Sequence, residues 1–170
     1  MRDYRVITLT QPWATLVAIG AKRIETRSWE TLYRGPLLIH AAAGLGPVGG
    51  KFGLVDLCHT EPFNDVLQAA GIRRATRLPF GAIVARCELV DCVLTWPSWA
   101  TVEPWFVGAR KGVGQHHYEV PPPANSNERA FGDYTPGRYA WLLADARPLA
   151  TPIPARGQLG LWRWSGELPI

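Results

Sequence analysis

A lysine, a glutamate and an arginine stand close together near the N-terminus, at Lys22, Glu25 and Arg27. An extended strand would place Glu25 and Arg27 on one face, whereas a helical turn or bulge after Gly20 would bring Lys22 to Glu25. A desolvated lysine can act as base or nucleophile, a carboxylate can relay a proton, and an arginine can hold a phosphate or an oxyanion. The same spacing also fits a solvated ion-pair face worth only ~0–1 kcal/mol, which spacing alone favours.

Aromatic and basic residues elsewhere in the chain can extend such a site. Trp13 and Trp29 flank the three charged residues, and a tryptophan stacked on a nucleobase contributes ~1–3 kcal/mol. Trp13 also lies on an apolar stripe, which favours a core role, so Trp29 is the better stacking candidate. Three arginines, Arg73, Arg74 and Arg77, form a basic stretch without acids. They can follow a phosphate backbone, and a solvated helix end explains them equally well.

Two further side chains have both a structural and a chemical interpretation. His40 and Leu38 are two positions apart, so on a strand they lie on the same face, which is typical of a core histidine. A neutral imidazole can also serve as acid or base. On the predicted strand 80–94, Glu88 lies on the same face as Arg86, and it can supply a second carboxylate. An outward ion pair with Arg86 is the simpler interpretation of Glu88.

Composition limits the classes of protein to which the chain can belong. Its 18 Lys and Arg residues against 14 acids give a net charge of +4, which permits a polyanionic partner without requiring one. The three cysteines lack CxxC spacing, so we predict no disulfide framework, no metal site and no cofactor. No apolar run reaches the ~20 residues of a membrane span, and no signal peptide is evident, so we predict a cytoplasmic protein without a membrane partner.

The elements that must position these residues are mostly short strands. A helix is predicted from Trp13, where apolar residues recur at i, i+3, i+4 and i+7 up to Gly20, and another around Phe63 to Ala70. The predicted strands cover 4–10, 22–29, 36–42, 80–94, 138–145, 147–153 and 159–164, with the fifth and sixth divided near Asp145. Residues 44–53 are predicted to be a glycine-rich loop. Because strands outnumber helices and do not alternate with them, we expect an α+β barrel or sheet.

The segment at about 95–136 interrupts this regularity. It contains Trp96, Trp99 and Trp105, then a run of three prolines, and its first part suits a short helix. A connection this long is usually functional or mobile. We therefore predict a single domain over 1–170 with a long insertion or loop there.

Three blocks of sequence together resemble the ASCH (ASC-1 homology) domain family of the PUA-like superfamily. The first is LTQPW at 9–13, and the second is GAKRIETR at 20–27, which fits the pattern GxKxxExR and leads to GPLLIHAA at 35–42. The third is FGDYTPGRYAW at 131–141, continuing to GQLGLW at 157–162. The pattern alone recurs by chance, but between these flanks it is specific.

The resemblance implies a five- to six-stranded PUA-like β-barrel with a few short flanking helices and a cleft beside the first helix. In this family the lysine, glutamate and arginine of the pattern, here Lys22, Glu25 and Arg27, are thought to face that cleft. The family is associated with binding RNA and other nucleic acids. Some small members hydrolyse acetylated cytidine nucleosides through a lysine that Lys22 matches, and ribonuclease activity is attributed to others. The threonine that follows three residues later in those hydrolases is Glu25 here.

Three functions are therefore compatible with the sequence. The first is a module that binds RNA or another single-stranded nucleic acid through Lys22, Glu25, Arg27, Trp29 and Trp13, with the basic stretch as outer contact. The second is a metal-independent hydrolase of a modified nucleoside, or a ribonuclease, with Lys22 and Glu25 as catalytic residues. The third is an interaction domain whose partner binds the long insertion. The sequence leaves the ligand and the oligomeric state open.

Overall fold

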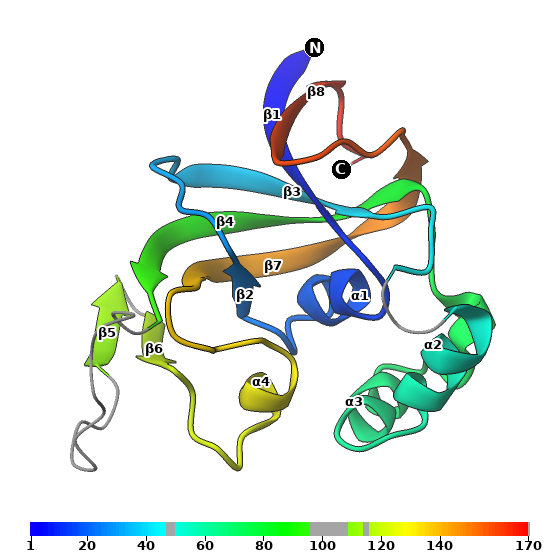
Figure 1. The fold of residues 1–170 in the computed structure, drawn as a ribbon. Coiled ribbons are helices and arrows are strands. Elements are labelled where there is room, and N and C mark those ends of the chain that lie inside the picture. Colours follow the sequence, from blue (N-terminus) through cyan, green and yellow to red (C-terminus); the bar gives the residue numbers. More distant parts are fainter. Residues whose placement is uncertain (47–49, 96–108, 114–115, 170) are drawn as a thin grey trace. The chain divides into compact units, whose positions relative to one another are not determined.

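The computed structural model describes residues 1–46, 50–95, 109–113 and 116–169. A mixed six-stranded sheet has the order β2-β7-β4-β3-β1-β8, and β5 pairs with β6 in a separate hairpin (Figure 1). Within these described ranges, four short α-helices and one 3-10 turn complete this α+β arrangement, as predicted. The strand order has edges at β2 and β8, so the sheet is not closed, and the barrel stays a prediction.

The described chain divides into two compact units, each made of separated segments. The first contains residues 1–22, 36–87 and 145–170, and the second contains residues 23–35 and 88–144. The strands β4 (Ala82–Leu94) and β7 (Tyr139–Pro154) each run from one unit into the other. That residues 1–170 form a single domain remains a prediction.

In the first unit, β1 (Arg2–Leu9) pairs in parallel with β3 (Gly35–Ala41) and antiparallel with β8 (Leu161–Gly166). Side chains of these strands pack with Ile83 of β4 in a core cluster, which contains Val6, Leu38, Ile83 and Trp162. The helix α1 (Trp13–Ala18) follows β1, as the apolar spacing predicted. Gly20 closes this helix with φ +77°, a left-handed conformation that favours glycine.

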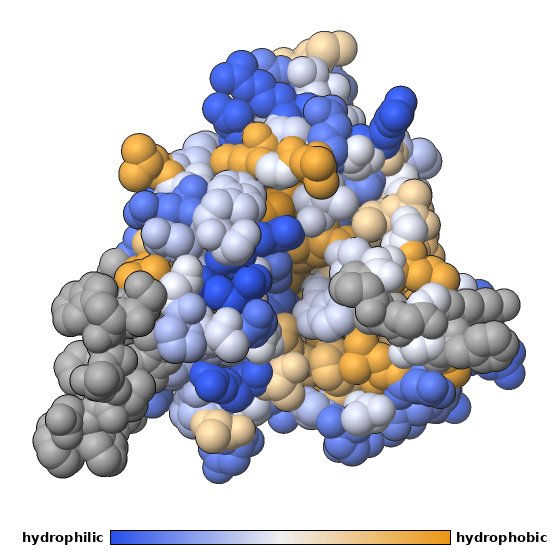
Figure 2. Space-filling view, viewed as in Figure 1, coloured by the Kyte–Doolittle hydropathy of each residue, from blue (hydrophilic) through white to orange (hydrophobic). Residues whose placement is uncertain are grey.

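Two further helices of the first unit pack on each other. They are α2 (Gly50–Cys58) and α3 (Phe63–Ala69), and the 3-10 turn η1 (Ala75–Arg77) follows them. Figure 2 shows hydrophilic residues along the outer rim of this pair and hydrophobic ones farther in. The prediction of a loop over 44–53 was wrong for its last residues, because the helix α2 begins at position 50. The burial of Leu54 shows that this helix packs through an apolar face.

In the second unit, β2 (Ile24–Arg27) pairs antiparallel with β7. A hairpin of β5 (Ala109–Val113) and β6 (His116–Val120) and the short helix α4 (Asn127–Ala130) lie where no regular element was predicted. The sequence HHYEV does alternate, since Tyr118 and Val120 are buried between polar neighbours, and this signal was missed. The helix expected in the first part of 95–136, and its three tryptophans, lie outside the described residues.

The predicted division of strand 138–153 near Asp145 was wrong. The chain continues as the single strand β7, although Asp145 has φ +51°. Aspartate tolerates this left-handed conformation, so one irregular residue interrupts the backbone without ending the strand. In the described part of the chain, no helix combines the length and the apolar character that crossing a membrane demands.

Candidate functional site

Glu25 and Arg27 lie side by side on β2, in the second unit. Their side chains form an ion pair with 3.1 Å between Arg27 Nε and Glu25 Oε1. The arginine side chain is 25% exposed and the glutamate side chain 12%. Opposite them on β7 stand Tyr139 and Trp141, and residues directly opposite in an antiparallel pair share a face. The two charges therefore occupy a half-buried face with aromatic neighbours, which is not a freely solvated surface.

The other face of β2 is buried in the core of the second unit. Ile24 packs with Tyr118, Tyr134 and Leu142, and the Tyr118 hydroxyl donates to the carbonyl of Leu143 at 2.7 Å. Burial raises the pKa of Tyr134 far above its usual range, and the nearby carboxylates of Glu128 and Glu25 add to the effect. Tyr134 thus stays a neutral phenol, and the core fixes the strand that carries Glu25 and Arg27.

A carboxylate from α4 holds the beginning of β2. The Glu128 side chain accepts hydrogen bonds from the backbone N–H groups of Arg23 at 2.8 Å and Ile24 at 3.0 Å. Its helix begins at Ser126, whose hydroxyl accepts from the backbone N–H of Arg129 at 3.2 Å. Glu128 was not predicted from the sequence, because a contact between residues over a hundred positions apart leaves no local pattern.

The segment before β7 also binds the arm, the name used for residues 22–29. The backbone N–H of Asp133 donates to the Thr26 hydroxyl at 3.1 Å, and Arg138 donates to the Thr26 carbonyl at 3.3 Å. Arg138 also pairs with the Asp133 carboxylate at 3.3 Å. A hydrogen bond from the backbone of Thr135 is the main reason that the pKa of Asp133 is lowered. These contacts connect the FGDYTPGR block to β2.

Trp29 follows β2 and contacts a buried tryptophan. Its ring stands edge-to-face with that of Trp141, with centroids 4.7 Å apart and planes at 88°. The indole N–H of Trp141 also points to the Trp29 carbonyl at 3.4 Å. Trp141 is fully buried, whereas Trp29 is half-buried and keeps part of its ring surface exposed.

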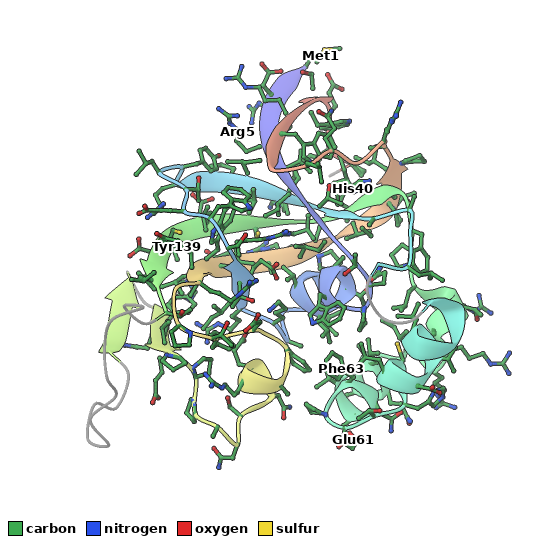
Figure 3. The ribbon with its side chains drawn as sticks, in the orientation of Figure 1. Met1, Arg5, His40, Glu61, Phe63 and Tyr139 are labelled. Carbon is green, nitrogen blue, oxygen red and sulfur yellow. The ribbon has the colours of Figure 1, made fainter. Side chains whose placement is uncertain are left out.

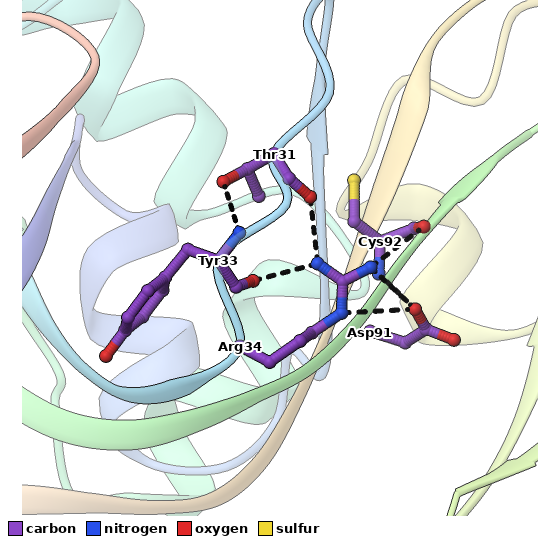
Figure 4. Close-up of polar contacts among 5 residues, drawn as sticks. All are labelled: Thr31, Tyr33, Arg34, Asp91 and Cys92. Carbon is purple, nitrogen blue, oxygen red and sulfur yellow. Dashed lines mark hydrogen bonds and ion pairs between the residues drawn. The ribbon is translucent and has the colours of Figure 1, made fainter.

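Beyond Trp29, a single arginine anchors the connection to β3. The Arg34 guanidinium donates to the carbonyls of Thr31 and Tyr33, both at 2.8 Å, and pairs with Asp91 on β4 at 2.8 Å (Figure 4). The Tyr33 backbone N–H in turn donates to the Thr31 hydroxyl at 3.1 Å. The segment that carries Trp29 is therefore fixed at both of its ends.

Lys22 belongs to the first unit and is almost completely buried. It is 1% exposed, and its backbone N–H donates to the carbonyl of Leu16 at 3.0 Å as the chain leaves α1. A lysine at this depth does not lie on a solvated ion-pair face. Trp13 begins α1 and packs edge-to-face on Phe63 of α3, with centroids 6.2 Å apart (Figure 3). This contact agrees with a packing role for Trp13.

The basic stretch lies around η1 in the first unit. The side chains of Arg73, Arg74 and Arg77 are exposed. The cavity beside the first two, at Cys58 and His59, measures only about 10 Å³, which is room for one water. The stretch thus offers exposed cations without a pocket for a small ligand.

The structure groups the predicted site residues by unit. Glu25, Arg27 and Trp29 belong to the second unit, together with the half-buried Glu88. Lys22, Trp13 and the three arginines belong to the first. Their assignment as one site remains a prediction. Among the described residues, no three His, Cys, Asp or Glu side chains gather where they could hold a metal ion.

The family model of the ASCH domain matches residues 7–150. The chain belongs to the ASCH domain family. The match includes the arm with Glu25 and Arg27, the helix α1 and the block before β7. The family predicted from three sequence blocks is therefore confirmed.

Two curated relatives and one solved structure resemble this ASCH domain. Activating signal cointegrator 1 is 31% identical in Mus musculus and 30% in Homo sapiens, each over 87 residues and 51% of this chain. The match spans only 14% of the length of either relative. A crystal structure of a mutant of ZmASCH from Zymomonas mobilis is 18% identical, with a TM-score of 0.44, over 89% of this chain and 76% of that one.

Proposed function

We propose that this ASCH domain binds single-stranded nucleic acid, with RNA as the preferred polymer and a PUA-like barrel as its framework. Family membership supports the proposal, because ASCH domains are associated with RNA binding. The observation that carries it is the half-buried Arg27, paired with Glu25, which stands opposite Trp141, the ring that Trp29 contacts. A guanidinium on the strand and a partly exposed tryptophan two residues later suit a phosphate followed by a base.

Each proposed contact has a stated energetic role. Arg27 pairs with a phosphate, and because Glu25 already fixes its orientation, little side-chain entropy is lost on binding. Trp29 stacks on one base, worth ~1–3 kcal/mol, whatever the identity of that base. Arg73, Arg74 and Arg77 add phosphate contacts that depend strongly on salt. Lys22 is a buried lysine at the beginning of the GxKxxExR arm.

A salt-resolved titration tests the proposal. Fluorescein-labelled single-stranded RNA, single-stranded DNA and duplex DNA of equal length are compared by anisotropy at several salt concentrations. We expect the tightest binding for RNA and an affinity that falls steeply as salt rises. Binding no better than that of a neutral control protein, or equal for all three polymers, would contradict the proposal.

Variants then separate the contacts. Arg27→Gln and Trp29→Ala each lower the affinity by about tenfold, and the first also reduces the salt slope. A triple Arg73→Gln, Arg74→Gln and Arg77→Gln variant reduces the slope further. Arg163→Gln, which removes an exposed arginine of β8, is the matched control and leaves the affinity unchanged. If the control weakens binding as much as Arg27→Gln does, only net charge is involved.

A hydrolase is the second candidate, and the burial of Lys22 supports it. Buried lysine amines are the kind that enzymes use as nucleophiles. The reaction adds water across the exocyclic amide of an N-acetylated cytidine, breaks the C–N bond, and releases acetate and the free amine. Chromatography of N4-acetylcytidine incubations tests this, and a gel of the RNA from the titration tests for strand cleavage. Product formation that Lys22→Met abolishes supports the enzyme, and no product from either substrate excludes these two activities.

A further inference from the structure

A cavity of about 380 Å³ lies within the first unit, beside the ends of β1 and β3. Its wall includes Thr8 from β1, His40 from β3 and the segment from Arg156 to Leu159 that precedes β8. The volume falls within the ~300–1,000 Å³ of small-molecule sites. Neither the Lys22 to Trp29 arm nor the basic stretch contributes to this wall.

The imidazole of His40 has one ring nitrogen, Nδ1, that can accept a hydrogen bond in this wall. His40 is completely buried, and its Nε2 lies 3.0 Å from the Ala155 carbonyl (Figure 3). A carbonyl only accepts hydrogen bonds, so Nε2 carries the proton and Nδ1 is left as an acceptor. Within the described residues, Nδ1 is buried and has no hydrogen-bond partner. Buried acceptors rarely lack a hydrogen-bond donor, so we expect a ligand to supply the donor for Nδ1.

Gly157 covers this nitrogen with backbone alone. A Cβ at position 157 would lie 2.6 Å from His40 Cε1, 2.9 Å from Nδ1 and 3.2 Å from the Thr8 hydroxyl. The missing side chain therefore leaves the Nδ1 edge of His40 and the Thr8 hydroxyl facing the same spot. A ligand donor reaches this spot when the Gly157 backbone moves outward.

Neighbouring contacts hold the imidazole in place. The Trp162 ring stands edge-to-face with His40, with centroids 5.7 Å apart, and its indole N–H donates to the Thr8 hydroxyl at 3.1 Å. That hydroxyl donates in turn to the Gln158 carbonyl at 3.1 Å. The ring thus has a fixed orientation, as a recognition group requires.

The rest of the wall has a positive and an apolar part. Arg156 is exposed, and no carboxylate of the described ranges pairs with it. Ala42, Ala43 and the fully exposed Leu159 provide apolar surface, and the wall contains no acidic residue. A matching ligand therefore has a flat apolar body, an N–H donor and an anionic group.

We propose that this cavity binds a nucleoside monophosphate, with a base N–H donated to His40 Nδ1 and the phosphate paired with Arg156. The base lies against the alanines and Leu159, and a nucleotide has the size that the cavity admits. The same chemistry comes from a free mononucleotide or from the phosphorylated end of a strand. The site does not depend on the proposed function, because its residues are separate from the arm.

Calorimetry with the four ribonucleoside 5′-monophosphates tests the proposal, with the matching nucleosides and inorganic phosphate as further probes. We expect saturable binding of at least one monophosphate, at least fivefold weaker binding of its nucleoside, and none of phosphate alone. Gly157→Ala places a methyl against the imidazole and lowers the affinity at least tenfold. Arg156→Gln lowers it about fivefold, whereas the exposed Arg163→Gln does not change it.

A spectroscopic measurement reports on His40 without altering the fold. In ¹⁵N-labelled protein, the Nδ1 resonance of His40 shifts on adding the monophosphate, because it begins to accept a hydrogen bond. His40→Gln keeps a donor for the Ala155 carbonyl and removes Nδ1, so it weakens binding at least tenfold. Absence of saturable binding, or binding that leaves the Nδ1 resonance and the Gly157→Ala affinity unchanged, overturns the proposal.

The two possible sources of the nucleotide are separated with short strands. A tetranucleotide with a terminal phosphate and one without it are titrated against wild type and Gly157→Ala. A terminal nucleotide is the ligand if only the phosphorylated strand binds tighter than the monophosphate, and the free mononucleotide is the ligand if neither strand does. Gly157→Ala weakens binding of the monophosphate, whereas Arg27→Gln weakens binding of long single-stranded RNA, so loss of this site and loss of RNA binding are distinguishable.

Discussion

The Trp29 ring stands at right angles to the Trp141 ring, with the centroids 4.7 Å apart. Trp29→Ala removes this pair and the packing around it, so we expect the free energy of unfolding to fall by about 1–3 kcal/mol. Trp29→Phe keeps an aromatic edge and loses less than half as much. Urea titrations followed by circular dichroism measure both. Equal stability of the alanine variant and wild type would mean that the contact contributes nothing.

Removing the Glu128 carboxylate should loosen the beginning of β2. Glu128→Ala leaves the N–H groups of Arg23 and Ile24 without their acceptor, so we expect a loss of about 1–2 kcal/mol. Faster amide exchange at residues 23 and 24 in the same variant would locate the change. Glu167→Ala is the matched control, since that side chain is 88% exposed and pairs only with the terminal ammonium among the described groups. Slow exchange at both amides in the variant would show that Glu128 is not needed there.

Replacing Arg34 with lysine should release the segment between Trp29 and β3. A lysine cannot reach Asp91 and the carbonyls of Thr31 and Tyr33 together, so Arg34→Lys costs about 1 kcal/mol. The expected loss of stability is small because the arginine side chain is 36% exposed to solvent. Asp91→Asn, made alone and with Arg34→Lys, gives the coupling between the two residues. If the losses of stability in the two single variants add up to the loss in the double variant, the ion pair contributes no coupling energy.

Stability should rise with pH as His40 loses its proton. Burial lowers the pKa of His40 below 6.5, although the hydrogen bond to Ala155 opposes part of this change. Between the lowered pKa and 6.5 the unfolded chain binds more protons than the native one, so acid destabilises the fold. We expect the free energy of unfolding to increase as the pH rises toward 6.5 and to level off at about pH 7. His40→Gln flattens this part of the profile, and an unchanged slope in that variant would assign the effect to other groups.

Local sequence patterns predicted the elements whose signals are local. The apolar spacing after Trp13 and after Phe63 predicted α1 and α3, since one buried face imposes that period. Alternation predicted the long strand β4. The region from 109 to 130 was missed because prolines and an Asn-Ser-Asn run dominate it, although HHYEV alternates within it.

The candidate site was predictable only in part, for a physical reason. Lys22, Glu25 and Arg27 were found because a family pattern fixes their spacing, and their residue types restrict the chemistry. Their burial was not predictable, since it depends on what the fold places over them: Lys22 is 1% exposed where a solvated face was the simpler expectation. Glu128 and Gly157 act through contacts made in space, with Ile24 and His40 respectively, and no neighbouring residue marks them.

The antiparallel pairing of β1 with β8 determines where any added polypeptide leaves the domain. Arg2 stands opposite Gly166, and the Met1 ammonium lies 3.5 Å from the Glu167 carboxylate. The beginning of β1 and the end of β8 therefore lie side by side. Affinity tags or fused modules at either end depart from the same pair of strands, and two bulky fusions would crowd each other there.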